Sequence, residues 1–120
     1  HNSPNAEHLK AHHESFFLNI REKNPDLPVI MATKTDIPRS PAAEKSNAAH
    51  RAVVYETYEN AVKRGDRNVI FIDGATVFSK ALTLSAPADS CTVDGCHPND
   101  LGFACMAKVF GDAIEKMLGL

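Results

Sequence analysis

The sequence predicts an α/β fold built on a parallel sheet. Two short segments, 29–32 and 69–72, are continuously apolar without alternation, as expected of strands covered on both faces. Long segments with helical apolar periodicity alternate with them, giving the order helix, strand, helix, strand, loop, helix. Apolar strands that alternate with amphipathic helices are typical of α/β domains with parallel sheets.

Composition limits the classes of function. The 120 residues suffice for one domain with a core and are too few for two ordinary ones. A formal net charge of -2 gives no basis for proposing nucleic acid or an anionic membrane as a partner. No apolar run approaches the roughly 20 residues that span a bilayer. We therefore expect a soluble globular protein without a membrane span.

The first helix is predicted between residues 3 and 25. Ser3 or Asn5 can cap its start, and Pro4 suits its first position. Pro25 disfavours the helical conformation at Asn24 and so ends the helix. Apolar spacing predicts a buried stripe of Leu9, His13, Phe16, Phe17 and Ile20.

The second helix is predicted from Pro41 to Arg64, capped by Ser40 and ended near Gly65. Its predicted core stripe consists of Val54, Tyr58, Ala61 and Val62. After the strand at 69–72, residues 75–93 have an irregular pattern, with a short helical turn expected around Val77 and Phe78.

The last helix is predicted from Asn99 or Asp100 to Gly119. Cys105 falls at an apolar position and is interpreted as a small core residue. The predicted inward stripe consists of Phe103, Met106, Ala107, Phe110, Ile114 and Met117. Two strands cannot form a stable covered sheet alone, so we expect an upstream segment or a partner to supply more strands. The incomplete sheet could also mediate self-association.

The stretch "TVDGCHPNDLGF", residues 92–103, contains the candidate catalytic residues. Asp94 lies three residues before His97 and can reach its imidazole, fixing the tautomer through Nδ1 and leaving Nε2 to act as a base. Pro98 biases His97 to an extended backbone at the entrance of the last helix. In the alternative interpretation, Asp94 and Gly95 form only a turn, Asn99 or Asp100 caps a helix, and His97 is merely exposed.

"DGCHPNDLGF" resembles the last sequence block of the SGNH, or GDSL-type, esterases and acylhydrolases. "HNSPNAEHL", followed by a long helix and "NPDLPVIMAT", is similar to the segment after that family's third strand. The resemblance implies a three-layer α/β/α sandwich of flavodoxin-like type with a parallel sheet. It further implies a serine carboxylic ester hydrolase that uses a Ser-His-Asp triad.

By this resemblance, His97 would be the general base, Asp94 would orient it, and Asn2 would donate its amide to the oxyanion. Asn5 competes with Asn2, and helix capping is the alternative role for either. The family's serine belongs to a G-D-S-type block that this sequence lacks. None of its serines lies in a G-D-S or G-x-S-x-G context: Ser3, Ser15, Ser40, Ser46, Ser79, Ser85 and Ser90.

We therefore expect residues 1–120 to be the C-terminal part of a single SGNH-hydrolase-like domain, a processed or truncated piece of a longer protein. The isolated chain should show no triad hydrolysis. The implied substrate is an O-acyl ester, either a small acetyl ester on a carbohydrate or a lipid-like acyl ester. The implied chemistry needs no metal or organic cofactor.

The alternative class is a non-catalytic binding or interaction module whose incomplete sheet edge pairs with a partner or a second copy. The two hypotheses differ in whether an upstream serine block exists. Many members of the resembled family are exported, which allows a secreted or periplasmic location, although no signal segment is visible.

The cysteines near the motif allow two further interpretations. Cys91 and Cys96 could form a loop disulfide, depending on the redox compartment. Together with Asp94 and His97 they could also bind a metal, but the C-x4-C-H spacing lies at the edge of zinc patterns. A structural role without metal is favoured.

Other polar residues are better explained by surface chemistry. His8 and His12 lie at i, i+4 on one helical face and favour a solvated face over a metal site. Lys34, Asp36 and Arg39 follow the first predicted strand, where substrate-facing loops occur, although an ordinary surface turn is the simpler interpretation.

Overall fold

The computed structural model describes residues 3–81 and 88–120 and follows the predicted order of elements. Two turns of 3-10 helix, η1 (Gly74–Thr76) and η2 (Ala88–Cys91), flank the short helix predicted around Val77 and Phe78. The helices and strands are α1 (Ala6–Lys23), β1 (Val29–Ala32), α2 (Pro41–Lys63), β2 (Val69–Ile72), α3 (Val77–Ala81) and α4 (Asp100–Leu118). Both strands have the predicted bounds.

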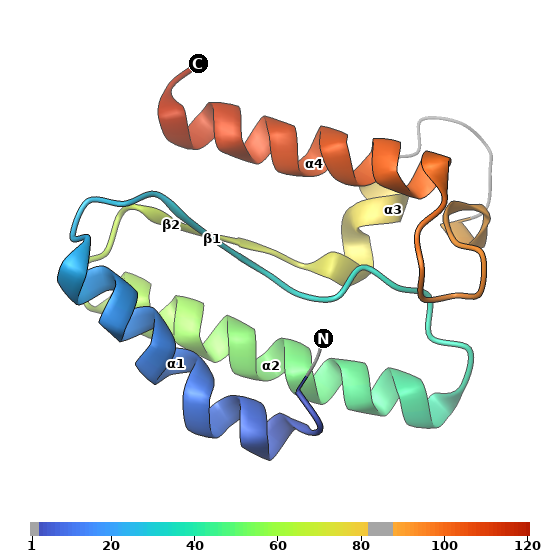
Figure 1. Cartoon of the computed structure of the whole chain (residues 1–120), viewed down its shortest axis with the longest axis horizontal. Coiled ribbons are helices and arrows are strands. Elements are labelled where there is room, and N and C mark those ends of the chain that lie inside the picture. The colour runs from blue at the N-terminus through green and yellow to red at the C-terminus, as the bar shows by residue number, and fades with distance from the viewer. Residues whose placement is uncertain (1–2, 82–87) are drawn as a thin grey trace.

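The two strands pair in parallel, with Val29 opposite Val69 and Ala32 opposite Ile72. Figure 1 shows three layers, with α1 and α2 on one face of the sheet and α4 on the other. The α/β fold with a parallel sheet is therefore confirmed, and so is the three-layer arrangement that the family resemblance implied.

The continuous apolar character of the strands results from a core on each face of the sheet. On the α1 and α2 side, Met31 and Val69 pack in a buried cluster with Phe17, Val54 and Ala61. On the α4 side, Ile72 packs in a second cluster with Val77, Phe78, Cys91 and Cys105. Successive strand residues point to opposite faces, so both sets of positions must be apolar.

Side-chain caps set the starts of the long helices. Asn5 accepts a hydrogen bond from His8 N at 2.8 Å, which makes Asn5 the N-cap of α1. Pro4 therefore precedes the helix, and its predicted place at the first helical position is wrong. Ser40 caps α2, whose first residue is Pro41, as predicted. Gly119 ends α4 with φ +71°, a left-handed conformation that favours glycine.

Several predicted stripe residues face solvent. Phe16 of α1 and Val62 of α2 are 66% and 46% exposed, and Phe103 and Ile114 of α4 are 58% and 47% exposed. Ala107 is also exposed. The apolar arcs of the helices are wider than the contact that a two-stranded sheet offers. Apolar spacing alone therefore did not show which edge of each arc faces inward.

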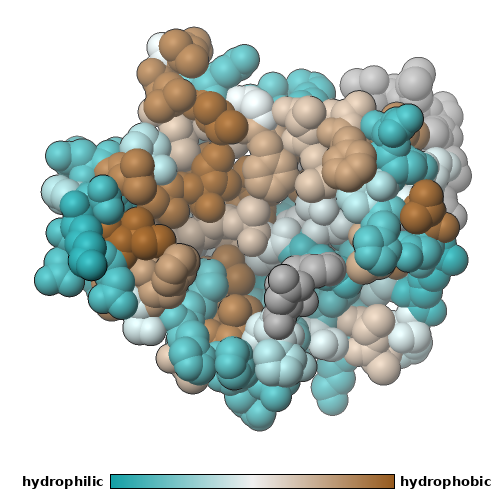
Figure 2. Space-filling model, in the orientation of Figure 1, coloured by the Kyte–Doolittle hydropathy of each residue, from teal (hydrophilic) through white to brown (hydrophobic). Residues whose placement is uncertain are grey.

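Several exposed apolar side chains lie near the C-terminal end of α4, among them Ile114, Leu118 and Leu120. In Figure 2 they form a brown region over α4 and the adjoining part of the sheet. A hollow of about 240 Å³ there is lined by Pro28, Ile30, Ile114, Met117 and Leu118. Within the described ranges, no helix combines the length and the apolar character that crossing a bilayer requires.

Candidate active site

The segment from Cys91 to Asn99, called the 91–99 loop below, joins η2 to α4. An antiparallel bridge between Thr92 and Pro98 closes it. Val93 N donates to His97 O at 3.0 Å, and Asn99 N donates to Cys91 O at 3.1 Å. At its tip, Gly95 has φ +88°, which favours glycine because it lacks a Cβ atom. The loop is thus a tightly hydrogen-bonded turn.

Asp94 organises the centre of this loop. Its Oδ1 accepts hydrogen bonds from the backbone N–H groups of Cys96 and His97, both at 2.8 Å. Its Oδ2 lies 2.6 Å from His97 Nδ1. The His97 backbone donor, then the His97 ring and the Cys96 backbone donor, hold the pKa of Asp94 well below its usual range. Asp94 is therefore a carboxylate at neutral pH.

The contact with Asp94 determines the orientation of the His97 ring. An ionised carboxylate only accepts hydrogen bonds, so Nδ1 carries the proton and Nε2 is the available base. The side chains of His97 and Asp94 are 72% and 49% exposed. The structure thus contains the Asp94–His97 contact that the spacing predicted, with the imidazole accessible to a reacting group.

The loop after β1 supports the 91–99 loop from one side. Ile37 N donates to Gly95 O at 2.8 Å. The side chain of Arg39 lies against Gly95 so closely that a Cβ added there would be 2.4 Å from Arg39 Nε. Arg39 therefore contacts the loop that carries His97.

Asp36 holds the loop after β1 in place. It is 8% exposed, and it pairs with Lys34 Nζ at 2.6 Å and accepts hydrogen bonds from Asn47 Nδ2. Although burial opposes the charged form, Asp36 and the neighbouring Cys96 raise the pKa of Lys34 above its ordinary value. Sequence analysis did not anticipate this buried network, because "KTDIPR" has the composition of an exposed turn.

Helix α4 supports the loop from the other side. Asn99 caps α4 by accepting from Gly102 N at 3.0 Å and donates its amide to Ser90 O at 2.8 Å. A Cβ at Gly102 would be 2.1 Å from Cys91 O, so this close approach requires glycine. The helix-capping role of Asn99 therefore accompanies the Asp94–His97 contact and does not compete with it.

The remaining sequence candidates are distributed elsewhere. Asn2, the predicted oxyanion donor, lies outside the described residues. No disulfide links Cys91 and Cys96. No group of three or more His, Cys, Asp or Glu side chains in the described ranges is placed to hold a metal. His13, predicted at the core edge, is half-buried against Thr57 Oγ1 at 2.8 Å, and burial lowers its pKa.

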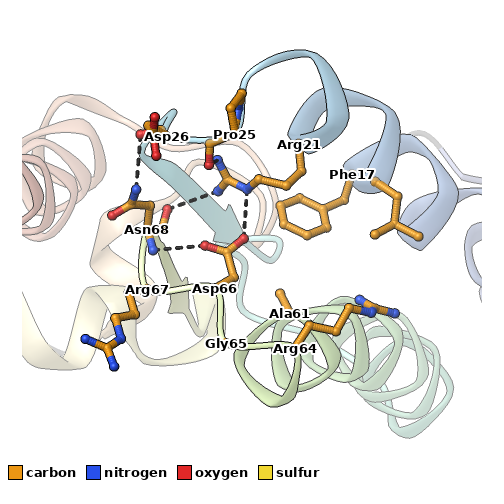
Figure 3. A pocket seen from close by; sticks show the side chains of 11 residues that line it. Phe17, Arg21, Pro25, Asp26, Ala61, Arg64, Gly65, Asp66, Arg67 and Asn68 are labelled. Carbon is orange, nitrogen blue, oxygen red and sulfur yellow. Dashed lines mark hydrogen bonds and ion pairs between the residues drawn. The ribbon is translucent and has the colours of Figure 1, made fainter.

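Two cavities lie at opposite ends of the strands. One of about 340 Å³ adjoins the carboxyl end of β1 and is lined by Thr33 and Lys34 together with residues of α1 and α2. The other, of about 420 Å³, lies at the amino ends of the strands, where Arg21 and Asp66 meet (Figure 3). Only the first is at the end where ligand sites of parallel sheets gather.

Comparison with known proteins gives one family match and two similar solved structures. Residues 2–115 match the GDSL-like lipase/acylhydrolase family. A Bacteroides ovatus protein described as a GDSL-like lipase aligns with 98% of this chain at 27% identity and a TM-score of 0.79. A salicylyl-acyltransferase from a tetracycline biosynthetic pathway aligns with 86% of it at 25% identity and a TM-score of 0.64.

The alignments cover 34% and 30% of those two solved chains, so this chain spans about a third of their length. No curated protein matches. The family match covers nearly all of the 120 residues, including the 91–99 loop, and the solved structures share its fold. The chain belongs to the GDSL-like lipase/acylhydrolase family.

Proposed function

We propose that this chain is the C-terminal part of a serine ester hydrolase and supplies the general base of its triad, His97, with Asp94 as the orienting carboxylate. The observation that carries the proposal is the 2.6 Å contact between His97 Nδ1 and Asp94 Oδ2. Three hydrogen bonds hold the Asp94 carboxylate, so the ring has a defined orientation before substrate binds.

In the proposed reaction, a serine outside these 120 residues attacks the carbonyl carbon of an O-acyl ester. His97 Nε2 takes the serine proton, and the Asp94 carboxylate stabilises the resulting imidazolium. His97 then gives that proton to the departing alkoxide. In the second half, water deprotonated by His97 attacks the acyl-serine carbonyl, the bond to the serine oxygen breaks, and His97 returns the proton to that oxygen as the acid leaves. None of these steps requires a metal or an organic cofactor.

The proposed reaction also needs a hydrogen-bond donor to the oxyanion. Asn2 is the choice that the family resemblance favours. Asn5 is the competing choice; its side-chain oxygen caps α1, while its amide nitrogen remains able to donate. A donor aimed at the oxyanion contributes about 10²–10³-fold to such reactions. We therefore propose Asn2 for this role.

The proposed substrates are O-acyl esters, with small acetyl esters of carbohydrates and lipid-like esters as the two classes to compare. Transfer of the acyl group to an alcohol is a second candidate reaction, favoured by the likeness to the salicylyl-acyltransferase. Both reactions use the same base, which deprotonates water in one case and the acceptor hydroxyl in the other. Product analysis with an added alcohol separates them.

The test is turnover of p-nitrophenyl acetate by the full-length gene product and by the isolated 120 residues. We expect turnover by the full-length product, its loss in the His97→Ala variant, and none by the isolated chain. Turnover by the isolated chain that disappears with His97→Ala would show that the nucleophile lies within it. A full-length product that keeps its activity after His97→Ala would refute the assigned base.

A further inference from the structure

Two cysteines meet under the 91–99 loop. Cys91 ends η2 and is fully buried, and Cys105 of α4 is 5% exposed. Their sulfur atoms are 3.9 Å apart, in the core cluster between the sheet and α4. The backbones on both sides are held in place, because Asn99 N donates to Cys91 O at the start of α4.

We propose that Cys91 and Cys105 form a disulfide when the chain folds under oxidising conditions, which makes this pair a cross-linking site between η2 and α4. The bond requires the two sulfurs to approach from 3.9 Å to about 2.05 Å. The inference concerns a covalent modification of the fold and is independent of the proposed hydrolase activity.

The structure selects this pair against the alternative that includes Cys96. Cys91 points into the core with Cys105, whereas Cys96 is partly exposed and lies beside Lys34. In an unfolded chain the shorter Cys91–Cys96 loop would close at lower entropic cost. A dominant Cys91–Cys105 bond would therefore report folded geometry and not sequence proximity.

A glutathione-type disulfide is a sufficient oxidant. One cysteine thiolate attacks a glutathione sulfur, which forms a mixed disulfide and releases one glutathione thiolate. The second cysteine thiolate attacks the cysteine sulfur of that mixed disulfide and displaces the other glutathione. The two cysteines lose two electrons, the oxidant becomes two glutathione thiols, and the two cysteine protons end on those thiols.

The cross-link would close a ring that contains Asp94 and His97. Cys91 and Cys105 are 14 residues apart in the sequence, and the 91–99 loop lies between them. A bond across a loop of this length restricts the unfolded chain, so the oxidised protein should melt about 10 °C higher than the reduced one. Adding dithiothreitol should remove the difference.

The experiment is to refold the full-length gene product in a glutathione redox buffer, alkylate the remaining thiols and map the disulfide-linked peptides that contain Cys91, Cys96 or Cys105 by mass spectrometry. We expect Cys91–Cys105 as the dominant pair and an alkylated Cys96. A dominant Cys91–Cys96 or Cys96–Cys105 pair would overturn the proposal. So would three alkylated cysteines after refolding in fully oxidised glutathione.

Two variants complete the test. Cys96→Ser should keep both the cross-link and the higher melting temperature, because Cys96 does not belong to the pair. Cys105→Ala should form no Cys91 cross-link and lose the rise in melting temperature on oxidation. If Cys105→Ala does not fold, the peptide map of the unmodified sequence and the Cys96→Ser variant still decide the question.

Discussion

Two pairs that each join a carboxylate to a nitrogen donor lie at opposite ends of the strands and differ in burial. At the amino ends, Arg21 Nε donates to Asp66 Oδ2 at 2.8 Å, with both side chains largely buried at 16% and 13% exposure. At the carboxyl ends, His97 Nδ1 donates to Asp94 Oδ2 at 2.6 Å, with 72% and 49% exposure. Each pair joins a carboxylate to a nitrogen donor, yet their surroundings suit them to different tasks.

The buried pair joins chain segments. Arg21 Nη1 also donates to the carbonyl groups of Asn24, Pro25 and Leu27, so α1, the turn into β1 and the start of β2 meet on one guanidinium (Figure 3). The Asp94–His97 pair joins residues of one loop and leaves the imidazole accessible. The buried Arg21–Asp66 pair therefore stabilises the fold. The exposed Asp94–His97 pair is accessible, so its imidazole can exchange a proton with a reacting group.

The largest expected effect is a loss of ester turnover when the Asp94–His97 pair is changed. In the full-length gene product, Asp94→Asn should lower kcat/KM for p-nitrophenyl acetate by about 10⁴-fold, because the His97 ring loses its orienting carboxylate. The free energy of unfolding should fall by only about 1 kcal/mol, because the asparagine oxygen can still accept the two backbone hydrogen bonds. Ester turnover and urea unfolding of the same preparations measure both.

Asp112→Asn is the matched control, since Asp112 also forms an exposed contact, with Lys108 at 3.0 Å on α4. It should leave both quantities unchanged. An Asp94→Asn enzyme that retains more than a tenth of its activity would show that the 2.6 Å contact is only a structural turn.

The second effect concerns stability alone. Arg21→Met should lower the free energy of unfolding by about 3–5 kcal/mol, because it leaves the Asp66 carboxylate buried without its cation. Arg67→Met is the control, since Arg67 lines the same cavity but is exposed, and should cost less than about 0.5 kcal/mol. Equal urea midpoints for the two variants would contradict the structural role of the buried pair.

The third effect tests how rigidly the candidate site is held. Gly95→Ala should cost about 1–2 kcal/mol, because an alanine at φ +88° is strained and its Cβ would collide with Arg39. Gly111→Ala, with no heavy atom within 4 Å of the added Cβ, should instead stabilise α4 by up to about 1 kcal/mol. Thermal melts of both variants measure the difference, and a neutral Gly95→Ala would indicate a loop that adjusts freely.

Features set by residues near one another in the sequence could be predicted, whereas those set by distant partners could not. The strands and the Asp94–His97 contact follow from local patterns: continuous apolar runs of four residues and a carboxylate three residues before a histidine. The buried faces of the helices depend on partners far along the chain, and the Asp36 network depends on Asn47, 11 residues away on α2. Phe16, for example, has the spacing of a core residue, but its neighbour Phe17 takes the inward position.

The two carboxylate pairs themselves show this limit. Arg21 and Asp66 are 45 residues apart, and no spacing rule links them. Asp94 and His97 are three apart, so one turn brings them together. The functional interpretation of that turn depended on resemblance to a family, since the same spacing also occurs in ordinary turns.

The smallest expected effect is a titration that identifies which donors hold Asp94. Its pKa in the folded protein lies below the ordinary value of 3.8, so its contribution to stability is present above about pH 3.8 and is lost as the pH falls through the folded value. A carbon NMR titration of the Asp94 carboxyl should therefore give a midpoint well below 3.8.

The backbone N–H of His97 is the largest cause of the lowered Asp94 pKa, ahead of the His97 ring. His97→Ala removes only the ring, so the midpoint should rise yet stay below 3.8. A return to 3.8 would mean that the ring holds the carboxylate, and the loop would then lack the built-in orientation that distinguishes a catalytic pair from a surface contact.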